Sequence, residues 1–138
     1  MSYVLDASFV AALIIPDEKN PAVSKMYDKI ENDDERYTPN LFWYEITNIF
    51  KNLIRRKRYI CDEVLQFYPR VEVICLKHDS ETGIKYSRKL LRLCNDYNLS
   101  SYDAAYLELA ERKNAVLCTL DETLAAAAEK YSVAVLLN

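Results

Sequence analysis

The chain has 138 residues, of which 51% are hydrophobic, and this length and composition are typical of one folded domain rather than a disordered chain. The net charge of −3 gives no general attraction for nucleic acid, and one glycine, Gly83, is too few for a glycine-rich phosphate-binding loop. One histidine, His78, leaves almost no room for Ser-His-Asp or Cys-His catalysis. Carboxylates are the abundant groups for chemistry.

No apolar run approaches the ~20 residues of a membrane helix, and the first residues lack the basic segment of a signal peptide. Cys61, Cys75, Cys94 and Cys118 lie in apolar stretches without the paired spacing of a zinc site. We therefore expect free, buried thiols in a cytoplasmic protein that does not contact membranes. His78 is expected in a surface loop.

Hydrophobic periodicity predicts strands and helices that alternate along the whole chain. In chain order we expect a strand at residues 3–5, helices at 9–14 and 21–30, a strand at 37–38, helices at 41–57 and 61–67, a strand at 71–76, helices at 80–97 and 100–113, a strand at 115–119, a helix at 124–131 and a strand at 133–136. This alternation predicts one α/β domain over residues 1–138, a three-layer α/β/α fold with a central parallel sheet.

Three aspartates occupy the boundaries where strands give way to helices. Asp6 and Asp121 each come shortly after a predicted strand and begin a helix, and Asp103 lies three residues after Ser100 at another helix start. Each is also well suited to cap its helix, so capping is the alternative interpretation for every one of them. In a parallel sheet the functional crevice lies beyond the carboxyl ends of the strands, which is where Asp6 and Asp121 are expected.

Glu45 is unusual because it lies on the apolar side of its predicted helix. It is three residues after Phe42 and four before Ile49, so it projects from the face that meets the core. An ionised carboxylate buried without a partner is very costly. The sequence therefore predicts that an arginine, hydrogen bonds or a metal compensates Glu45.

Taken together, these acids predict a metal centre with a hydrolytic function. We expect Asp6, Glu45, Asp103 and Asp121 to converge on one crevice, where a hard divalent cation such as Mg²⁺ would remove their mutual repulsion. Such a cation would activate water for attack on a phosphodiester and neutralise the leaving oxygen. The hydroxyls of Ser8 and Thr119 are candidates to orient water or a carboxylate, or they are ordinary polar residues at a first turn and a strand end.

Four separated stretches, in this order, resemble the PIN-domain family and, within it, the VapC-type toxins of toxin–antitoxin pairs. They are residues 4–10, 39–48, 99–110 and 118–124. The resemblance implies an endoribonuclease that depends on Mg²⁺ or Mn²⁺, with the family's acids at Asp6, Glu45, Asp103 and Asp121, the last being the most variable. It also implies a homodimer and a small VapB-like antitoxin that masks the site.

Basic side chains gather at the end of the predicted helix 41–57. This basic cluster consists of Lys51, Arg55, Arg56, Lys57 and Arg58. It is either a contact surface for RNA phosphates or a solvated helix end whose cations favour the helix dipole. A second candidate surface is formed by Lys85, Arg88, Lys89 and Arg92, and some of the eleven tyrosines are candidates to stack on unpaired bases.

Three other kinds of protein also carry acids at the ends of strands. A phospho-acceptor signalling domain needs an acidic pair near the first strand and a lysine at a late strand end, and neither is present. A haloacid-type phosphatase needs a second acid at position 8, which is Ser8. A catalytically inactive PIN-like binding module remains, although all four acids are retained. The sequence leaves the target RNA and the number of metal ions open.

Overall fold

A parallel sheet of four strands forms the middle layer of the computed structural model, which describes residues 1–136. The strands are β1 (Ser2–Leu5), β2 (Glu35–Pro39), β3 (Lys77–Asp79) and β4 (Val116–Cys118), in the order β3-β2-β1-β4. All three pairs of neighbouring strands are parallel. The strand order reverses beside β1, because β2 lies on one side of it and β4 on the other.

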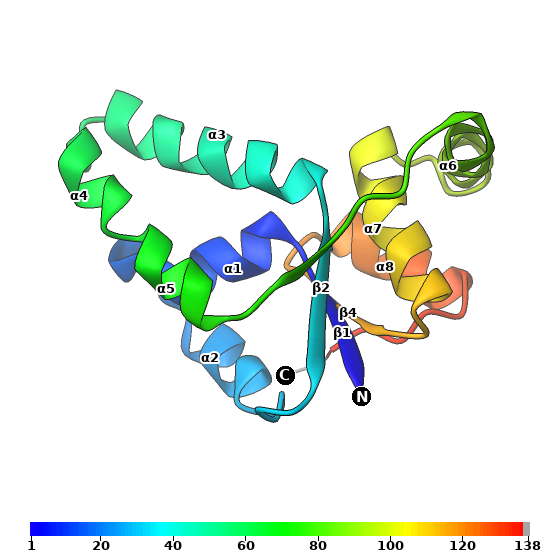
Figure 1. Cartoon of the computed structure of the whole chain (residues 1–138), viewed down its shortest axis with the longest axis horizontal. Helices are drawn as coiled ribbons and strands as arrows, with labels where there is room; N and C mark the ends of the chain where they lie inside the picture. The colour runs from blue at the N-terminus through cyan, green and yellow to red at the C-terminus, as the bar shows by residue number, and fades with distance from the viewer. Residues whose placement is uncertain (137–138) are drawn as a thin grey trace.

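Helices cover both faces of the sheet, which confirms the predicted three-layer α/β/α fold (Figure 1). They are α1 (Ala7–Ile14), the 3₁₀ helix η1 (Pro16–Glu18), α2 (Pro21–Tyr27), α3 (Leu41–Arg55), α4 (Cys61–Leu65), α5 (Tyr68–Val73), α6 (Ile84–Tyr97), α7 (Ser101–Arg112) and α8 (Glu122–Lys130). Figure 1 shows α1 to α5 on one side of the strands and α6 to α8 on the other. Among residues 1–136, no helix has the length and apolar character needed to cross a bilayer.

The side chains of β1 explain why the sheet is covered twice. Tyr3 and Leu5 pack into one core with Phe42, whereas Val4 packs into a second core with Leu107. Successive side chains of a strand point to opposite faces, so the three consecutive apolar residues Tyr3, Val4 and Leu5 need a layer of helices on each side of the sheet.

The strand predicted at residues 71–76 is wrong, because that segment begins as helix α5 and the edge strand β3 follows it. Val71 and Ile74 are buried at helical spacing, while Val73 between them is 79% exposed. Pro69 lies in the first turn of α5, where a proline favours a helix start. Tertiary burial thus overrides the strand preference of the valines, and the polar segment Lys77–Asp79 takes the edge position.

Smaller differences concern the cysteines, His78 and the last strand. All four cysteines are free, but Cys61 and Cys75 are exposed, so the prediction of buried thiols is wrong for those two. His78 is exposed as expected but lies in β3 rather than in a loop. The strand expected at 133–136 is reduced to a single bridge between Val135 and Leu117.

Because the chain has one glycine, residues of other types take the left-handed backbone conformation at the ends of several helices. These residues are Lys57, Cys75, Asn98, Asn114 and Ser132. After α8, the Ser132 N–H donates to the Glu129 carbonyl at 3.3 Å and the Val133 N–H donates to the Ala128 carbonyl at 2.8 Å. This bonding closes the helix in a Schellman motif, a role that glycine fills with less strain.

We predict that Ser132→Gly raises the free energy of unfolding by about 0.5–1 kcal/mol, because relief of the left-handed strain exceeds the extra entropy of glycine in the unfolded chain. Asn114→Gly is the matched control and should gain less, since asparagine tolerates this conformation. Denaturant unfolding measures both, and a loss of stability in Ser132→Gly would contradict the strain argument.

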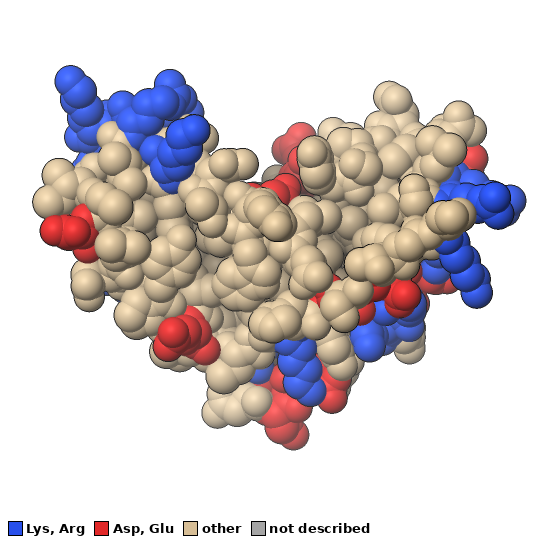
Figure 2. Space-filling view, turned by 45° about the horizontal axis from the view of Figure 1, so that its top comes forward, with Lys and Arg blue, Asp and Glu red and all other residues tan. Residues whose placement is uncertain are grey.

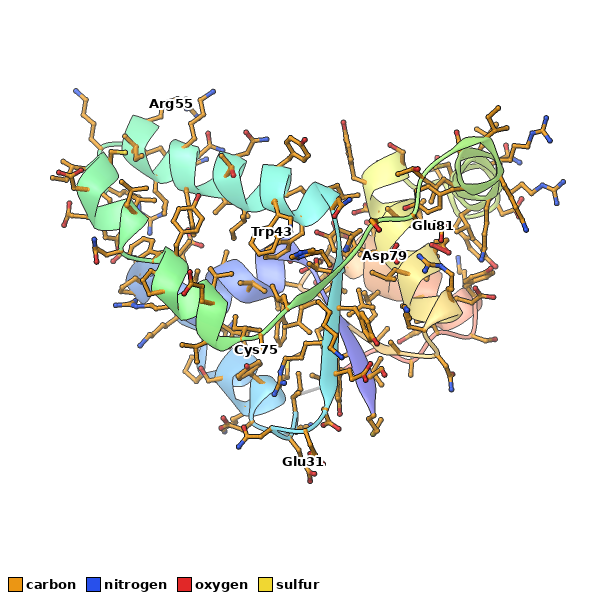
Figure 3. The ribbon with its side chains drawn as sticks, in the orientation of Figure 1. Glu31, Trp43, Arg55, Cys75, Asp79 and Glu81 are labelled. Carbon is orange, nitrogen blue, oxygen red and sulfur yellow. The ribbon has the colours of Figure 1, made fainter. Side chains whose placement is uncertain are left out.

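An ion network joins β3 to α7 on the α6 side of the sheet (Figure 3). Arg112 donates to the two carboxylate oxygens of Asp79 at 3.0 and 2.7 Å and also pairs with the buried Glu108. The Arg112 guanidinium lowers the pKa of Asp79. A carboxylate with a lowered pKa stabilises the fold above its unfolded pKa, about 3.9, and this contribution disappears as the pH falls through the folded pKa.

Asp79→Asn should therefore lower the free energy of unfolding by about 1–3 kcal/mol at pH 7, where the ion pair is intact. The difference from the wild type should shrink below about pH 4, as the carboxylate of the wild type becomes protonated. Denaturant unfolding at both pH values measures the effect, with the exposed Asp33→Asn as control. An equal loss of stability at both pH values would show that the charge of Asp79 is not responsible.

Candidate active site

A pocket of about 310 Å³ opens at the carboxyl ends of β1 and β4, where the strand order reverses. Its lining residues come from α1, α3, α7 and the loop before α8, and they are Asp6, Ala7, Ser8, Glu45, Asn48, Ile49, Asp103, Tyr106 and Asp121. Figure 2 shows acidic side chains at the notch between the two lobes of the molecule. The four acids singled out in the sequence therefore lie in one pocket, at the kind of position where α/β sheets bind ligands.

Asp6 is the most buried of these acids, with 6% of its surface exposed. Its Oδ1 accepts hydrogen bonds from the Ser8 hydroxyl at 2.7 Å and from the Phe9 N–H at 2.9 Å, and its Oδ2 accepts a short bond from the Thr119 hydroxyl. Asp6 thus caps α1, as the alternative interpretation predicted, and also lines the pocket. The three donors fix the orientation of its carboxylate.

The two hydroxyls that hold Asp6 also attach it to the loop after β4. The Thr119 oxygen accepts from the Asp121 N–H at 3.0 Å, and the Ser8 oxygen accepts from the Leu120 N–H at 3.4 Å. Ser8 and Thr119 therefore orient a carboxylate, one of the two tasks that the sequence suggested for them.

Glu45 is half-buried in α3 and is held from across the pocket by Tyr106 of α7. The Tyr106 hydroxyl donates to the Glu45 Oε1 at 2.5 Å, and this tyrosine is only 2% exposed. The expected compensation of Glu45 is thus a hydrogen bond rather than an arginine. Because the two residues belong to different helices, the bond also ties α3 to α7.

Asp103 and Asp121 complete the pocket from two further helix starts. The backbone N–H of Asp103 is capped by the Ser100 hydroxyl at 3.2 Å, which leaves the half-buried carboxylate of Asp103 directed to the pocket. The Asp121 Oδ1 caps α8 by accepting from the Leu124 N–H at 2.9 Å, and Asp121 is exposed. Asp121 is therefore the outermost of the four acids.

The pocket is electrostatically unfavourable for the carboxylates that line it. Burial raises the pKa of Asp6, Glu45 and Asp103 above their ordinary values, and the negative charges of the neighbouring acids raise them further. Hydrogen bonds to Asp6 and Glu45 oppose this effect only in part. Within the described part of the chain, the residues that line the pocket include no lysine or arginine to balance these charges.

The donor set fits a hard divalent cation. The charged groups of the pocket are carboxylates, the ligand type that Mg²⁺ and Mn²⁺ prefer, and the repulsion between them is what a cation would relieve. As the side chains stand, no three of the His, Cys, Asp or Glu residues between positions 1 and 136 form a group that could hold a metal ion. Mg²⁺ usually takes only one or two protein carboxylates and retains several waters, so an open site of this kind suits it.

Residues 3–130 match the PIN domain, which is most of the chain. The chain belongs to the PIN-domain family. It is 29% identical to Ribonuclease VapC3 of Pyrobaculum aerophilum over 91% of this chain and 93% of that protein. The resemblance noted in the sequence is thereby confirmed at the level of the family.

Solved structures share the fold of this PIN domain at lower sequence identity. PAE2754 of Pyrobaculum aerophilum superposes with a TM-score of 0.68 at 24% identity, over 92% of this chain and 87% of that one. VapC20 of Mycobacterium tuberculosis, described as a toxin that cleaves the sarcin–ricin loop, gives a TM-score of 0.65 at 15% identity, over 91% and 94% of the two chains. These likenesses concern the fold.

Two pocket residues, Asn48 and Tyr106, were not identified as site residues from the sequence. Asn48 lies three residues after Glu45 and Tyr106 three after Asp103, so each shares a helix face with an acid of the pocket. This spacing of three residues is the feature of the sequence that could have identified them as pocket residues. Tyr106 was not singled out because an aromatic residue on a buried helix face is ordinarily part of the core.

We predict that Tyr106→Phe lowers the free energy of unfolding by about 1–3 kcal/mol, because Glu45 loses its partner while remaining half-buried. The effect should be much smaller in a Glu45→Gln background, since the uncompensated charge is then absent. A double-mutant cycle by denaturant unfolding measures this coupling, with the exposed Tyr102→Phe as control. Additive effects of the two substitutions would contradict the proposed dependence of Glu45 on Tyr106.

Proposed function

We propose that this protein is a metal-dependent endoribonuclease that hydrolyses RNA phosphodiester bonds in the pocket of Asp6, Glu45, Asp103 and Asp121. The observation that carries the proposal is the convergence of four acids from separate elements on one pocket with no basic residue lining it. The similarity to a protein named Ribonuclease VapC3 supports the choice of RNA as substrate. The proposal treats residues 1–138 as a single nuclease domain.

In this proposal Mg²⁺ or Mn²⁺ is held by Asp6 and Asp103 with Glu45 and Asp121 as further carboxylates. When bound, the cation would act as a Lewis acid that lowers the pKa of water and neutralises charge on the scissile phosphate. Asp6 serves as the fixed ligand, because Ser8, Thr119 and the Phe9 N–H hold its two oxygens in one orientation. Such outer hydrogen bonds preserve the geometry of a metal ligand.

The remaining residues of the pocket position the reacting groups. Tyr106 holds Glu45 at the pocket wall, where its carboxylate is placed to accept a proton from the attacking water. Asn48, one helical turn beyond Glu45, offers an amide that can donate to a phosphate oxygen.

The biological context that we propose is a type II toxin–antitoxin pair. The nuclease is then the toxin, acting in the cytoplasm as a homodimer, and a small VapB-like antitoxin blocks the pocket. Support comes from the VapC3 relative and from the shared fold with VapBC2 of Rickettsia felis, whose structure has a bound fragment of promoter DNA. The identity of the target RNA is left open by this proposal.

Two alternative functions for this pocket are a phospho-acceptor signalling domain and a catalytically inactive binding module. A phospho-acceptor domain requires a lysine near its aspartate, and among the described residues no lysine lines the pocket. An inactive binding module has no need for uncompensated carboxylates, which destabilise a fold. Both features favour the nuclease over these alternatives.

The test is cleavage of a labelled RNA mixture by the purified protein with Mg²⁺, with Mn²⁺ and with a chelator. Cleavage is expected only with a divalent cation, and Asp6→Asn should reduce its rate by about 100-fold or more, because the main ligand loses its charge. Asp96→Asn, an exposed acid outside the pocket, is the control and should retain full activity. Cleavage in the presence of chelator, or a fully active Asp6→Asn variant, would exclude the proposal.

A further inference from the structure

A second cavity adjoins the acidic pocket and extends it along α3. It has a volume of about 410 Å³ and shares Ser8 and Ile49 with the pocket. Its other lining residues come from α1, the segment around η1, α3 and the loop after β4; they are Ala11, Ala12, Glu18, Asn20, Asn52, Leu53, Arg56 and Leu120. The two cavities therefore form one groove, which we call the α3 groove, between α1 and α3.

One face of α3 lines this groove from end to end. Glu45, Asn48 and Ile49 face the acidic pocket, and Asn52 and Arg56 follow at helical spacing in the second cavity. At 1.5 Å of rise per residue, Glu45 and Arg56 are about 16 Å apart along the helix axis. The groove is thus long enough for a few nucleotides of a single strand and carries hydrogen-bond donors along its wall.

The cations at the far end of the groove are not equivalent. Arg58 is bound by two acids near η1, to Asp17 at 3.1 Å and to Glu18 at 3.2 Å. These pairs also balance the charge of Glu18, the acid of the second cavity. Among the residues that the structure describes, Arg55 and Arg56 have no ion pair, and of the basic cluster only Arg56 lines the groove. Figure 2 shows Lys and Arg side chains, in blue, gathered at the upper left of the molecule, and Figure 3 shows Arg55 at the end of α3.

We propose that the α3 groove is the binding track of the RNA strand on one side of the scissile bond, with Arg56 as the phosphate-binding residue at its far end. The proposal rests on the nuclease function proposed above and assigns a substrate subsite to it. A strand with its scissile phosphate at the acids would pass Asn48 and Asn52 and bring a later phosphate to Arg56. The unpaired cation at Arg56 complements that phosphate, whereas Arg58 serves the fold.

The test measures binding of a fluorescent single-stranded 12-nucleotide RNA, in chelator so that no cleavage occurs. Arg56→Gln should weaken binding about fivefold at 0.1 M salt and reduce the slope of log affinity against log salt by about 0.7, the value for one lost phosphate contact. With Mg²⁺ present, the same variant should raise KM for this RNA and leave kcat unchanged, because Arg56 lies far from the reacting phosphate.

Arg55→Gln is the matched control, since it removes the same charge from the neighbouring residue outside the groove. It should leave affinity and salt slope close to those of the wild type over the same range of salt concentrations, because at 0.1 M salt charges more than about 10 Å away are largely screened. Equal losses in both variants would show a general effect of charge and would overturn the assignment of the groove. Unchanged RNA binding in Arg56→Gln with weaker binding of an antitoxin would identify the groove as a protein-docking site and would overturn it as well.

The outcomes separate this inference from the proposed function. Metal-dependent cleavage by the wild type with equal behaviour of Arg56→Gln and Arg55→Gln would remove the subsite and leave the nuclease. Binding of RNA that depends on Arg56, in a protein that cleaves no RNA with any divalent cation, would remove the nuclease and leave the groove as a site for RNA.

Discussion

The burial of several carboxylates in one pocket, where they also repel one another, is the main electrostatic cost in this structure. Burial removes Asp6, Glu45 and Asp103 wholly or partly from solvent and raises the pKa of each carboxylate, and the charge of a neighbouring acid raises it further. Isolated buried charges of this kind lower the stability of a fold. The proposed binding of a hard cation would offset this cost, because among the described residues no lysine or arginine lines the pocket to balance the carboxylates.

The topology of the sheet is what brings the acids together. β1 lies between β2 and β4, so the strand order reverses beside it and leaves a crevice above its carboxyl end. Asp6 follows β1, Asp121 lies in the loop after β4, Glu45 lies in the second turn of α3, and Asp103 lies in the first turn of α7. The hydrogen bonds of Thr119 and Tyr106 then join these elements across the crevice, so that parts of the chain distant in sequence share one polar network.

Much of this arrangement could be predicted because local and global signals agree. The apolar strand residues 3–5 and the inward position of Glu45 on its helix are patterns of short range, and the structure follows both. Residues 71–76 misled the prediction because valine and isoleucine suit a strand and a buried helix face equally, and only the packing of Val71 and Ile74 decides between them. The bond between Tyr106 and Glu45 joins residues far apart in sequence, and no local pattern contains such a contact. The α3 groove also could not be predicted, because it is lined by residues from segments that are far apart in the sequence.

Thermal unfolding of Asp103→Asn with and without Mn²⁺ measures the electrostatic cost of the pocket, because burial and the charges of Asp121 and Asp6 raise the pKa of the Asp103 carboxylate, and its hydrogen bond with Ser100 offsets that rise only in part. Without metal, near pH 7, we expect a higher melting temperature for Asp103→Asn than for the wild type. Mn²⁺ should raise the melting temperature of the wild type and have much less effect on the variant. A variant that melts below the wild type without metal, and whose melting temperature Mn²⁺ raises as much as that of the wild type, would show that the Asp103 carboxylate neither destabilises the fold nor binds the cation.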